Sequence, residues 1–172
     1  EFQGDFGMLF KGPFHVDGLM RLPLIWRPAP NAGVAPALIE APVGHVDLAP
    51  TICHLAGLKV PDWMQGAALP TTPGDSAKHE RTITEWQDSF DGNDVTMRPL
   101  YRDGQICTVY EKTSYYDSGD VGELYDLTDD PLQWHNLWHD PARQALKSDL
   151  IADLYDNLPE GRAEPLQKVA QV

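Results

Sequence analysis

One apolar run decides the fold class of this chain: Leu19-Met20-Arg21-Leu22-Pro23-Leu24-Ile25-Trp26-Arg27-Pro28. Proline cannot donate a hydrogen bond to a β-ladder, so Pro23 restricts the expected strand to residues 24–27. A short run that is almost entirely apolar is typical of a strand covered on both faces. Sheets of α/β proteins are covered in this way, and the run therefore predicts an α/β fold.

A helix is expected some twenty residues further along. Asp47 can cap its N-terminus, Pro50 falls in the first turn, where a missing N–H costs little, and Gly57 supplies a left-handed end. One apolar stripe runs along this helix, formed by Leu48, Ile52, Leu55 and Ala56. The strand, the loop and this helix predict an α/β part over residues 1–75.

The second part of the chain, residues 76–172, has a different pattern. Short β-type runs are expected at 82–86, 97–101, 105–110 and 123–127, and Asp103-Gly104 is a strong hairpin signal between two of them. A final helix is expected after Asp140, a cap residue followed by Pro141, and it carries leucines at 146, 150, 154 and 158. The prediction is a small antiparallel sheet packed by one C-terminal helix, and a loose tail after residue 158.

Composition excludes several classes of partner. The 172 residues include 13 basic and 26 acidic side chains, and the net charge of −13 makes nucleic acid or an anionic membrane surface a poor partner. No window approaches the roughly 20 apolar residues that a membrane span needs. Residues 61–172 hold nearly all of the excess negative charge, so an anion is better accommodated by the first third. We expect a soluble chain, cytoplasmic or periplasmic, and its start at Glu1 predicts a fragment or a processed product.

Few residues carry a chemical signal of their own. Lys11 is a single cation among aromatic residues, and His15 with Asp17 forms a His-x-Asp pair that is typical of a metal site or of a base with its carboxylate. The two cysteines, Cys53 and Cys107, lie in apolar surroundings and are read as core residues, although one disulfide is possible. These residues alone do not make a complete catalytic set.

Several short runs occur in a fixed order along the chain: GDFGMLFKGP at residues 4–13, RLPLI at 21–25, VDLAPT at 46–51, LAG at 55–57, QG at 65–66, ELYDL at 123–127, and the pairs Asp130-Pro131 and Asn136-Leu137. Together they resemble the C-terminal part of the sulfatase family, within the alkaline-phosphatase-like superfamily. The resemblance covers about residues 4 to 158 and begins just after the position of that family's Asp-His-Gly metal motif.

The resemblance implies hydrolysis of a sulfate ester. In that family a formylglycine made from cysteine attacks sulfur in its hydrated form, beside a divalent cation that is usually Ca²⁺. Lys11 matches the family lysine that contacts the sulfate and the leaving-group oxygen, where an ammonium stabilises developing negative charge. His15 falls where related members have a histidine or tyrosine near the substrate. Lys11 and His15 are the catalytic candidates, and this chain is predicted to contribute no metal ligand.

The chain departs from the family pattern in two respects. The formylglycine precursor motif follows neither cysteine, and the aspartates that hold the metal are absent, so both groups are expected outside this chain. The expected partners are a sulfate-ester substrate, the N-terminal portion of the same enzyme and a second copy in a homo-oligomer. Two alternatives stay open: a phosphonate or phosphodiester hydrolase of the same superfamily, and a non-catalytic binding module.

Overall fold

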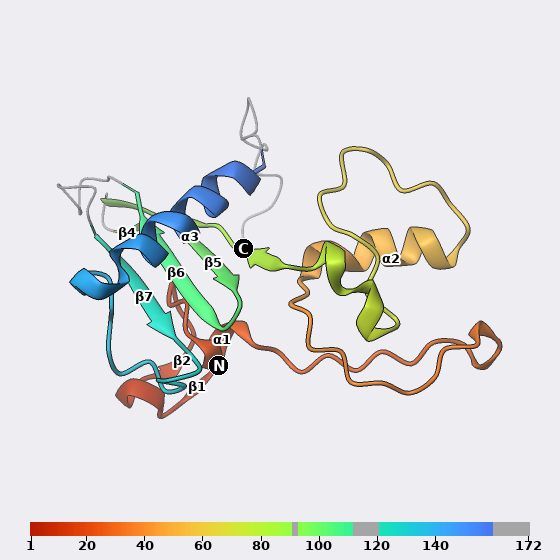
Figure 1. Cartoon of the computed structure of the whole chain (residues 1–172), viewed down its shortest axis with the longest axis horizontal. Helices are drawn as coiled ribbons and strands as arrows, with labels where there is room; N and C mark the ends of the chain where they lie inside the picture. Colours follow the sequence, from red (N-terminus) through yellow and green to blue (C-terminus); the bar gives the residue numbers. More distant parts are fainter. Residues whose placement is uncertain (91–92, 112–120, 160–172) are drawn as a thin grey trace.

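The computed structural model describes residues 1–90, 93–111 and 121–159. It is a mixed α/β structure whose largest unit is a five-stranded antiparallel sheet. The strands are β3 (Arg81–Ile83), β4 (Trp86–Phe90), β5 (Asn93–Arg102), β6 (Gln105–Tyr110) and β7 (Gly122–Asp126). Their order is β3-β5-β6-β7, and β4 also pairs with β5, so this long strand holds the sheet together (Figure 1).

The tight turn between β5 and β6 confirms the predicted hairpin. Asp103 and Gly104 have φ values of 50° and 77°, the conformation that a two-residue turn between antiparallel strands requires. The register pairs Arg102 with Gln105 across the turn. The acidic stretch at residues 88–94 was expected to be a loop, and this prediction was wrong: residues 88–90 belong to β4 and residues 93–94 to β5. The expected loop at 118–122 lies partly outside the described residues, and the expected tail after residue 158 lies outside them apart from residue 159.

The C-terminal helix α3 (Gln144–Asn157) covers one face of the sheet, as predicted. Asp140 accepts a hydrogen bond from the N–H of Ala142 at 2.9 Å and caps the short 3-10 helix Pro141–Arg143 that leads into α3. The core between helix and sheet is one cluster of buried side chains: Leu100, Cys107, Val109, Leu124, Trp138, Leu150 and Leu154. Leu150 and Leu154 lie four residues apart on one face of α3, and their burial fixes this face against the sheet.

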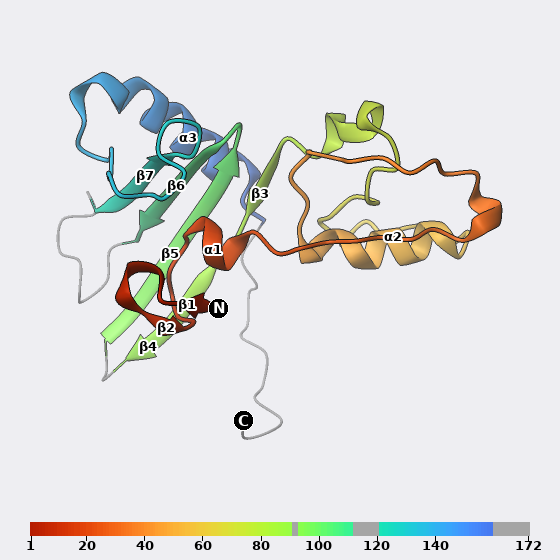
Figure 2. The same ribbon diagram turned by 90° about the horizontal axis from the view of Figure 1, so that it is seen from below.

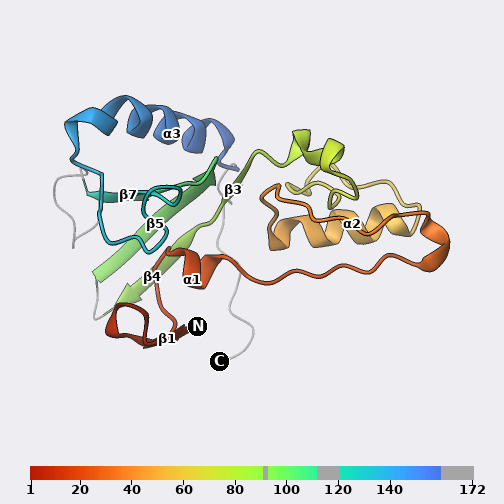
Figure 3. The ribbon, with the colours of Figure 1, turned by 60° about the horizontal axis from the view of Figure 1, so that its bottom comes forward.

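The N-terminal segment lies on the opposite side of the sheet from α3 (Figure 3). Residues 106–109 of β6 are all buried, and successive side chains of a strand point to opposite faces, so both faces of this strand are covered. The segment contains β1 (Phe2–Gln3), β2 (Leu9–Phe10) and the single-turn helix α1 (Asp17–Met20). The loop that carries the candidate residues thus lies on the side of the sheet opposite α3.

Helix α2 (Leu48–Leu55) stands away from the sheet, at the far end of an extended segment (Figure 2). Gly57 ends it with a φ of 67°, as predicted. The predicted cap differs in detail, because a 3-10 turn His45–Asp47 precedes α2 and the Asp47 carboxylate accepts from the N–H of Gly44 and of Ala67, each at 2.8 Å. Asp47 therefore ties two loops together at the start of α2.

The strand expected at residues 24–27 does not form, and this prediction was wrong. The segment is extended, but no described strand lies beside it, and the side chain of Ile25 is 94% exposed. A strand needs the N–H and C=O groups of a neighbouring edge, and Pro23 and Pro28 remove two donors from this segment. The segment is extended as predicted, and its apolar side chains Leu22, Leu24 and Ile25 are exposed in this chain.

Candidate functional site

The loop that carries both candidate residues begins as a small hairpin. Phe2 pairs with Phe10 and Gln3 with Leu9, and a 3-10 turn, Asp5–Gly7, connects the two strands. Gly4 and Gly7 have φ values of 117° and 72°, which glycine adopts without steric cost. The glycines noted in the sequence therefore bend the chain into a structured loop, and Lys11 follows directly after its second strand.

Lys11 is at the surface. Its side chain is 77% exposed, and its Nζ lies 3.7 Å from Oε1 of Glu1. An exposed ion pair of this kind contributes about 1 kcal/mol or less, because water screens it and both side chains lose freedom. The ammonium is therefore held weakly and is accessible to an anionic group.

His15 is in the opposite environment. Its side chain is 3% exposed, and burial lowers its pKa from 6.5 to about 4. The imidazole is neutral at pH 7, and its Nδ1 has no hydrogen-bond partner among the described residues. A buried polar atom with an unused hydrogen bond is uncommon and is costly to retain. The structure thus places Lys11 in solvent and His15 beneath the surface of the same loop.

A turn from the C-terminal part holds this loop. Gln133 is 5% exposed, and its Oε1 accepts a hydrogen bond from the N–H of Asp17 at 2.6 Å. The ring of the next residue, Trp134, contacts that of Phe6, with 5.9 Å between centroids. Nothing in the sequence singled out Gln133, because its contact joins residues 116 positions apart.

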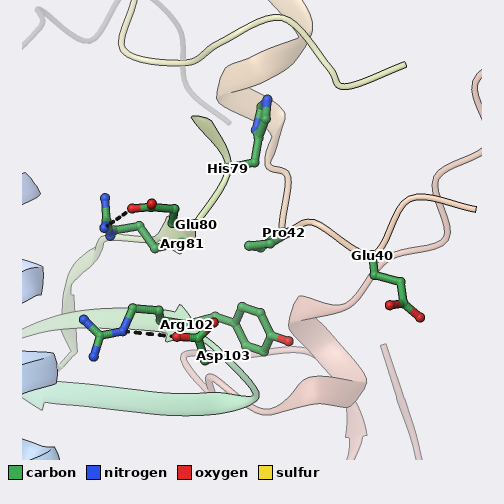
Figure 4. Close-up of a pocket in the computed structure, with 8 residues that line it drawn as sticks. Glu40, Pro42, His79, Glu80, Arg81, Arg102 and Asp103 are labelled. Carbon is green, nitrogen blue, oxygen red and sulfur yellow. Dashed lines mark hydrogen bonds and ion pairs between the residues drawn. The ribbon is translucent and has the colours of Figure 1, made fainter. Parts of the chain in front are cut away.

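A cleft lies elsewhere in the structure. It has a volume of about 440 Å³ and opens between the segment before α2 and the ends of β3 and β5 (Figure 4). Its lining is polar: Glu40, Pro42, His79, Glu80, Arg81, Tyr101, Arg102 and Asp103. Neither Lys11 nor His15 lines this cleft, so the candidate residues and the cleft are separate features of the described structure.

His79 and Asp47 form a buried contact near this cleft. His79 Nδ1 lies 3.7 Å from Oδ2 of Asp47, and His79 Nε2 lies 3.0 Å from the carbonyl oxygen of Ala68. Asp47 also binds the backbone N–H groups of two loops, so the pair fixes chain segments rather than a ligand. Its role is structural.

Among the described residues, neither a metal site nor a thiol nucleophile is found. The described residues contain no group of three or more His, Cys, Asp or Glu side chains that could hold a metal ion. Both cysteines are free, and burial in β6 raises the pKa of Cys107 to about 12, so its thiol is inert. The described residues therefore do not fit a divalent cation. Nor does any described helix have the length and apolar character required to cross a membrane.

Comparison with known proteins identifies the family. The family described as N-sulphoglucosamine sulphohydrolase, C-terminal, matches residues 4–159, and the chain belongs to it. The Δ4,5-hexuronate-2-O-sulfatase of Bacteroides thetaiotaomicron is 30% identical over 136 residues, which are 72% of this chain and 26% of that protein. The chain thus spans about a quarter of the length of this relative.

Solved structures agree with this assignment. A putative sulfatase from Bacteroides thetaiotaomicron matches with a TM-score of 0.54 and 31% identity, over 64% of this chain and 23% of that one. A phosphonate monoester hydrolase from Agrobacterium radiobacter matches with a TM-score of 0.52 and 18% identity, over 64% of this chain and 24% of that one. The second match shows the shared fold alone. The resemblance to the C-terminal part of sulfatases is confirmed.

Proposed function

We propose that this chain is the C-terminal portion of a sulfatase that hydrolyses a sulfate ester, and that it becomes active only with the rest of that enzyme. The observation that carries the proposal is the family match over residues 4–159. The sulfatase relative, 30% identical to this chain, supports the same reaction class. The division into an α/β part, residues 1–75, and a sheet-and-helix part, residues 76–172, belongs to this proposal.

Lys11 is the residue of this chain that acts on the substrate. Its ammonium is exposed and only weakly paired with Glu1, so an anion can displace the carboxylate. A sulfate ester gains negative charge on the departing oxygen as the S–O bond breaks, and a cation held close to that oxygen lowers the barrier. His15 is neutral and buried in the same loop, and its Nδ1 is unused among the described residues.

The nucleophile and the metal come from other residues. In the complete enzyme, a formylglycine would provide the nucleophile and a divalent cation, Ca²⁺ in this proposal, would provide positive charge beside the sulfate. No described group of residues in this chain fits the metal, and neither cysteine has the surroundings of a nucleophile. What this chain contributes is the ammonium of Lys11 and the scaffold that positions it.

The apolar face of α2 fits the remaining portion of the enzyme. Leu48, Ile52 and Leu55, which belong to the predicted stripe, are all exposed, and so is Ile25 on the extended segment. A row of exposed apolar side chains on one helix face is typical of an interface. The occupant we propose is the sheet of the same enzyme's N-terminal portion, and a second copy of this chain is the other occupant that a test must separate.

Kinetic assays of the complete enzyme test this function. An aryl sulfate should be turned over with a kcat/KM at least 100-fold above that for an aryl phosphodiester or phosphonate ester. A reversed preference would favour the phosphonate or phosphodiester hydrolase of the same fold. No turnover of any of these esters, with a chain that binds no divalent metal, would favour a non-catalytic module.

A further inference from the structure

We propose that Gln133 is a positioning residue that sets the loop bearing Lys11 and His15, an inference that rests on the proposed sulfatase function. Its side chain is almost completely buried, although glutamine is usually exposed. Its Oε1 accepts from the N–H of Asp17 at 2.6 Å, across 116 residues of sequence. This hydrogen bond joins the C-terminal part of the chain to the residue that begins α1.

The Asp17 N–H needs such a partner. The first N–H groups of a helix have no acceptor within the helix, and a local side chain usually caps them. Here the residue before the helix is Val16, which has no side-chain acceptor, and α1 has only four residues. The amide of Gln133 therefore replaces a local cap, and the position where the candidate loop ends depends on it.

The turn that carries Gln133 is held rigidly. Gln133 has a φ of 54°, a left-handed conformation that a residue with a side chain seldom adopts. Two hydrogen bonds maintain it: the N–H of Gln133 donates to the carbonyl of Asp130 at 3.1 Å, and the N–H of His135 donates to Asp130 Oδ2 at 2.8 Å. Backbone strain that is kept by surrounding bonds is typical of functional positions. The side-chain amide of Gln133 therefore contacts Asp17 from a backbone position that is itself held by hydrogen bonds.

A second contact from the same turn holds the other end of the loop. Trp134 packs against Phe6, and Phe6 packs edge-on against Phe2, with 6.1 Å between centroids. Phe6 precedes Lys11 and Asp17 follows His15, so the turn at residues 133–134 contacts the loop on both sides of the candidate residues. Of the two contacts, the hydrogen bond is the directional one, since it fixes one atom against another.

Two buried polar atoms without a hydrogen-bond partner belong to the turn that carries Gln133 and to the loop that it contacts. Gln133 Nε2 and His15 Nδ1 are both buried without a partner among the described residues. His15 lies two positions before Asp17, so a shift of α1 changes the surroundings of its ring. The imidazole is therefore a reporter of the position that Gln133 imposes.

Three variants of the complete enzyme test the inference. Gln133→Leu removes the acceptor at nearly constant volume, and Gln133→Glu keeps an oxygen that accepts from Asp17. Gln144→Leu is the matched control, because Gln144 Nε2 donates to the carbonyls of Trp138 and Asp140 and its contacts stay at the start of α3. We expect Q133L to lower kcat at least tenfold with a smaller change in KM, Q133E to restore most of it, and Q144L to change neither more than twofold. Equal losses in Q133L and Q144L, or no rescue by Q133E, would overturn the inference.

A measurement without turnover separates this inference from the proposed function. Amide hydrogen exchange at Asp17 should be at least tenfold faster in Q133L than in Q144L, and the NMR titration of His15 should move toward its ordinary range. Unchanged exchange and titration would overturn the role of Gln133 even in an active sulfatase. An inactive wild type would refute the proposed function, and the exchange data would still decide whether Gln133 sets the loop. Should Q133L fail to fold, Gln133→Asn, whose side chain is too short to reach Asp17, takes its place.

Discussion

Asp153 on α3 accepts a hydrogen bond from Nη1 of Arg102 on β5, over 2.7 Å. The same carboxylate lies 2.9 Å from Nε of Arg81 on β3, so one acidic group fastens the C-terminal helix to two strands. It is 11% exposed, and its partners shield it from water. This junction closes the sheet on the side away from the candidate loop.

Replacing Asp153 tests this junction. Asp153→Asn should lower the free energy of unfolding by about 1–3 kcal/mol, because charge-assisted hydrogen bonds to two arginines are lost in a partly buried site. Asp149→Asn is the control, since Asp149 also pairs with Arg102 but is 63% exposed and should contribute about 1 kcal/mol or less. Urea unfolding measures both variants. Equal losses of unfolding free energy in the two variants would mean that Asp153 is not the main link between α3 and the strands.

His15 should make stability depend on pH. Burial lowers its folded pKa from 6.5 to about 4, so the unfolded chain binds the proton more readily. Its contribution is therefore complete above pH 6.5 and is lost as the pH falls from 6.5 toward 4, by about 3 kcal/mol for a shift of this size. Unfolding measured at pH 7 and pH 4.5 should show the loss in wild type and less of it in His15→Gln. The same dependence in both would exclude His15 as its source.

Gly66 should tolerate no side chain. A Cβ at this position would lie 2.2 Å from the carbonyl oxygen of Val46 and 2.8 Å from the N–H of Asp47, and backbone cannot move aside easily. Gly66→Ala should cost about 1–3 kcal/mol as an overpacked site. Gly18→Ala is the matched control, because no atom lies within 4 Å of its Cβ, and its effect should stay within about 1 kcal/mol. Thermal unfolding distinguishes the two, and a neutral G66A would contradict the close approach.

Local sequence signals predicted much of this fold. Asp103-Gly104 specifies a hairpin because both residues accept a positive φ, and Asp140 with Pro141 marks the approach to α3 because its own carboxylate caps the turn. Gly66 belongs to a run that was recognised by resemblance. In each case the deciding interaction lies within a few residues, or the residue type itself carries the information.

The features that the sequence did not predict depend on contacts between residues distant in sequence. Residues 24–27 have the composition of a strand, but a strand exists only where another edge pairs with it, and composition does not report that edge. Gln133 bonds to Asp17 across 116 residues, and no local pattern marks it. Lys11 and His15 were singled out first by their local sequence and then by family resemblance. Their opposite exposures could not be read from the sequence, because burial is a property of the packed chain.

The exposed face of α2 should control association. Ile52 is 66% exposed, so Ile52→Glu should leave the free energy of unfolding of this chain within about 0.5 kcal/mol of wild type. The same change should abolish binding to the N-terminal portion of the enzyme, because it buries a charge in an apolar interface. Light scattering and pull-down of the two portions measure this. Loss of a homodimer, with intact binding to the N-terminal portion, would identify a second copy as the occupant instead.

Lys11→Ala should lower kcat/KM of the complete sulfatase at least tenfold, a loss of about 1.4 kcal/mol or more in transition-state stabilisation. The effect should grow with the basicity of the leaving group, because the ammonium acts on the departing oxygen. Stability should be unaffected, since the pair with Glu1 is exposed. Lys59→Ala is the matched control: Lys59 is equally exposed and pairs with Asp62 at 3.4 Å. Unchanged kinetics in K11A, or equal losses in both variants, would remove Lys11 from the reaction and leave a general effect of charge.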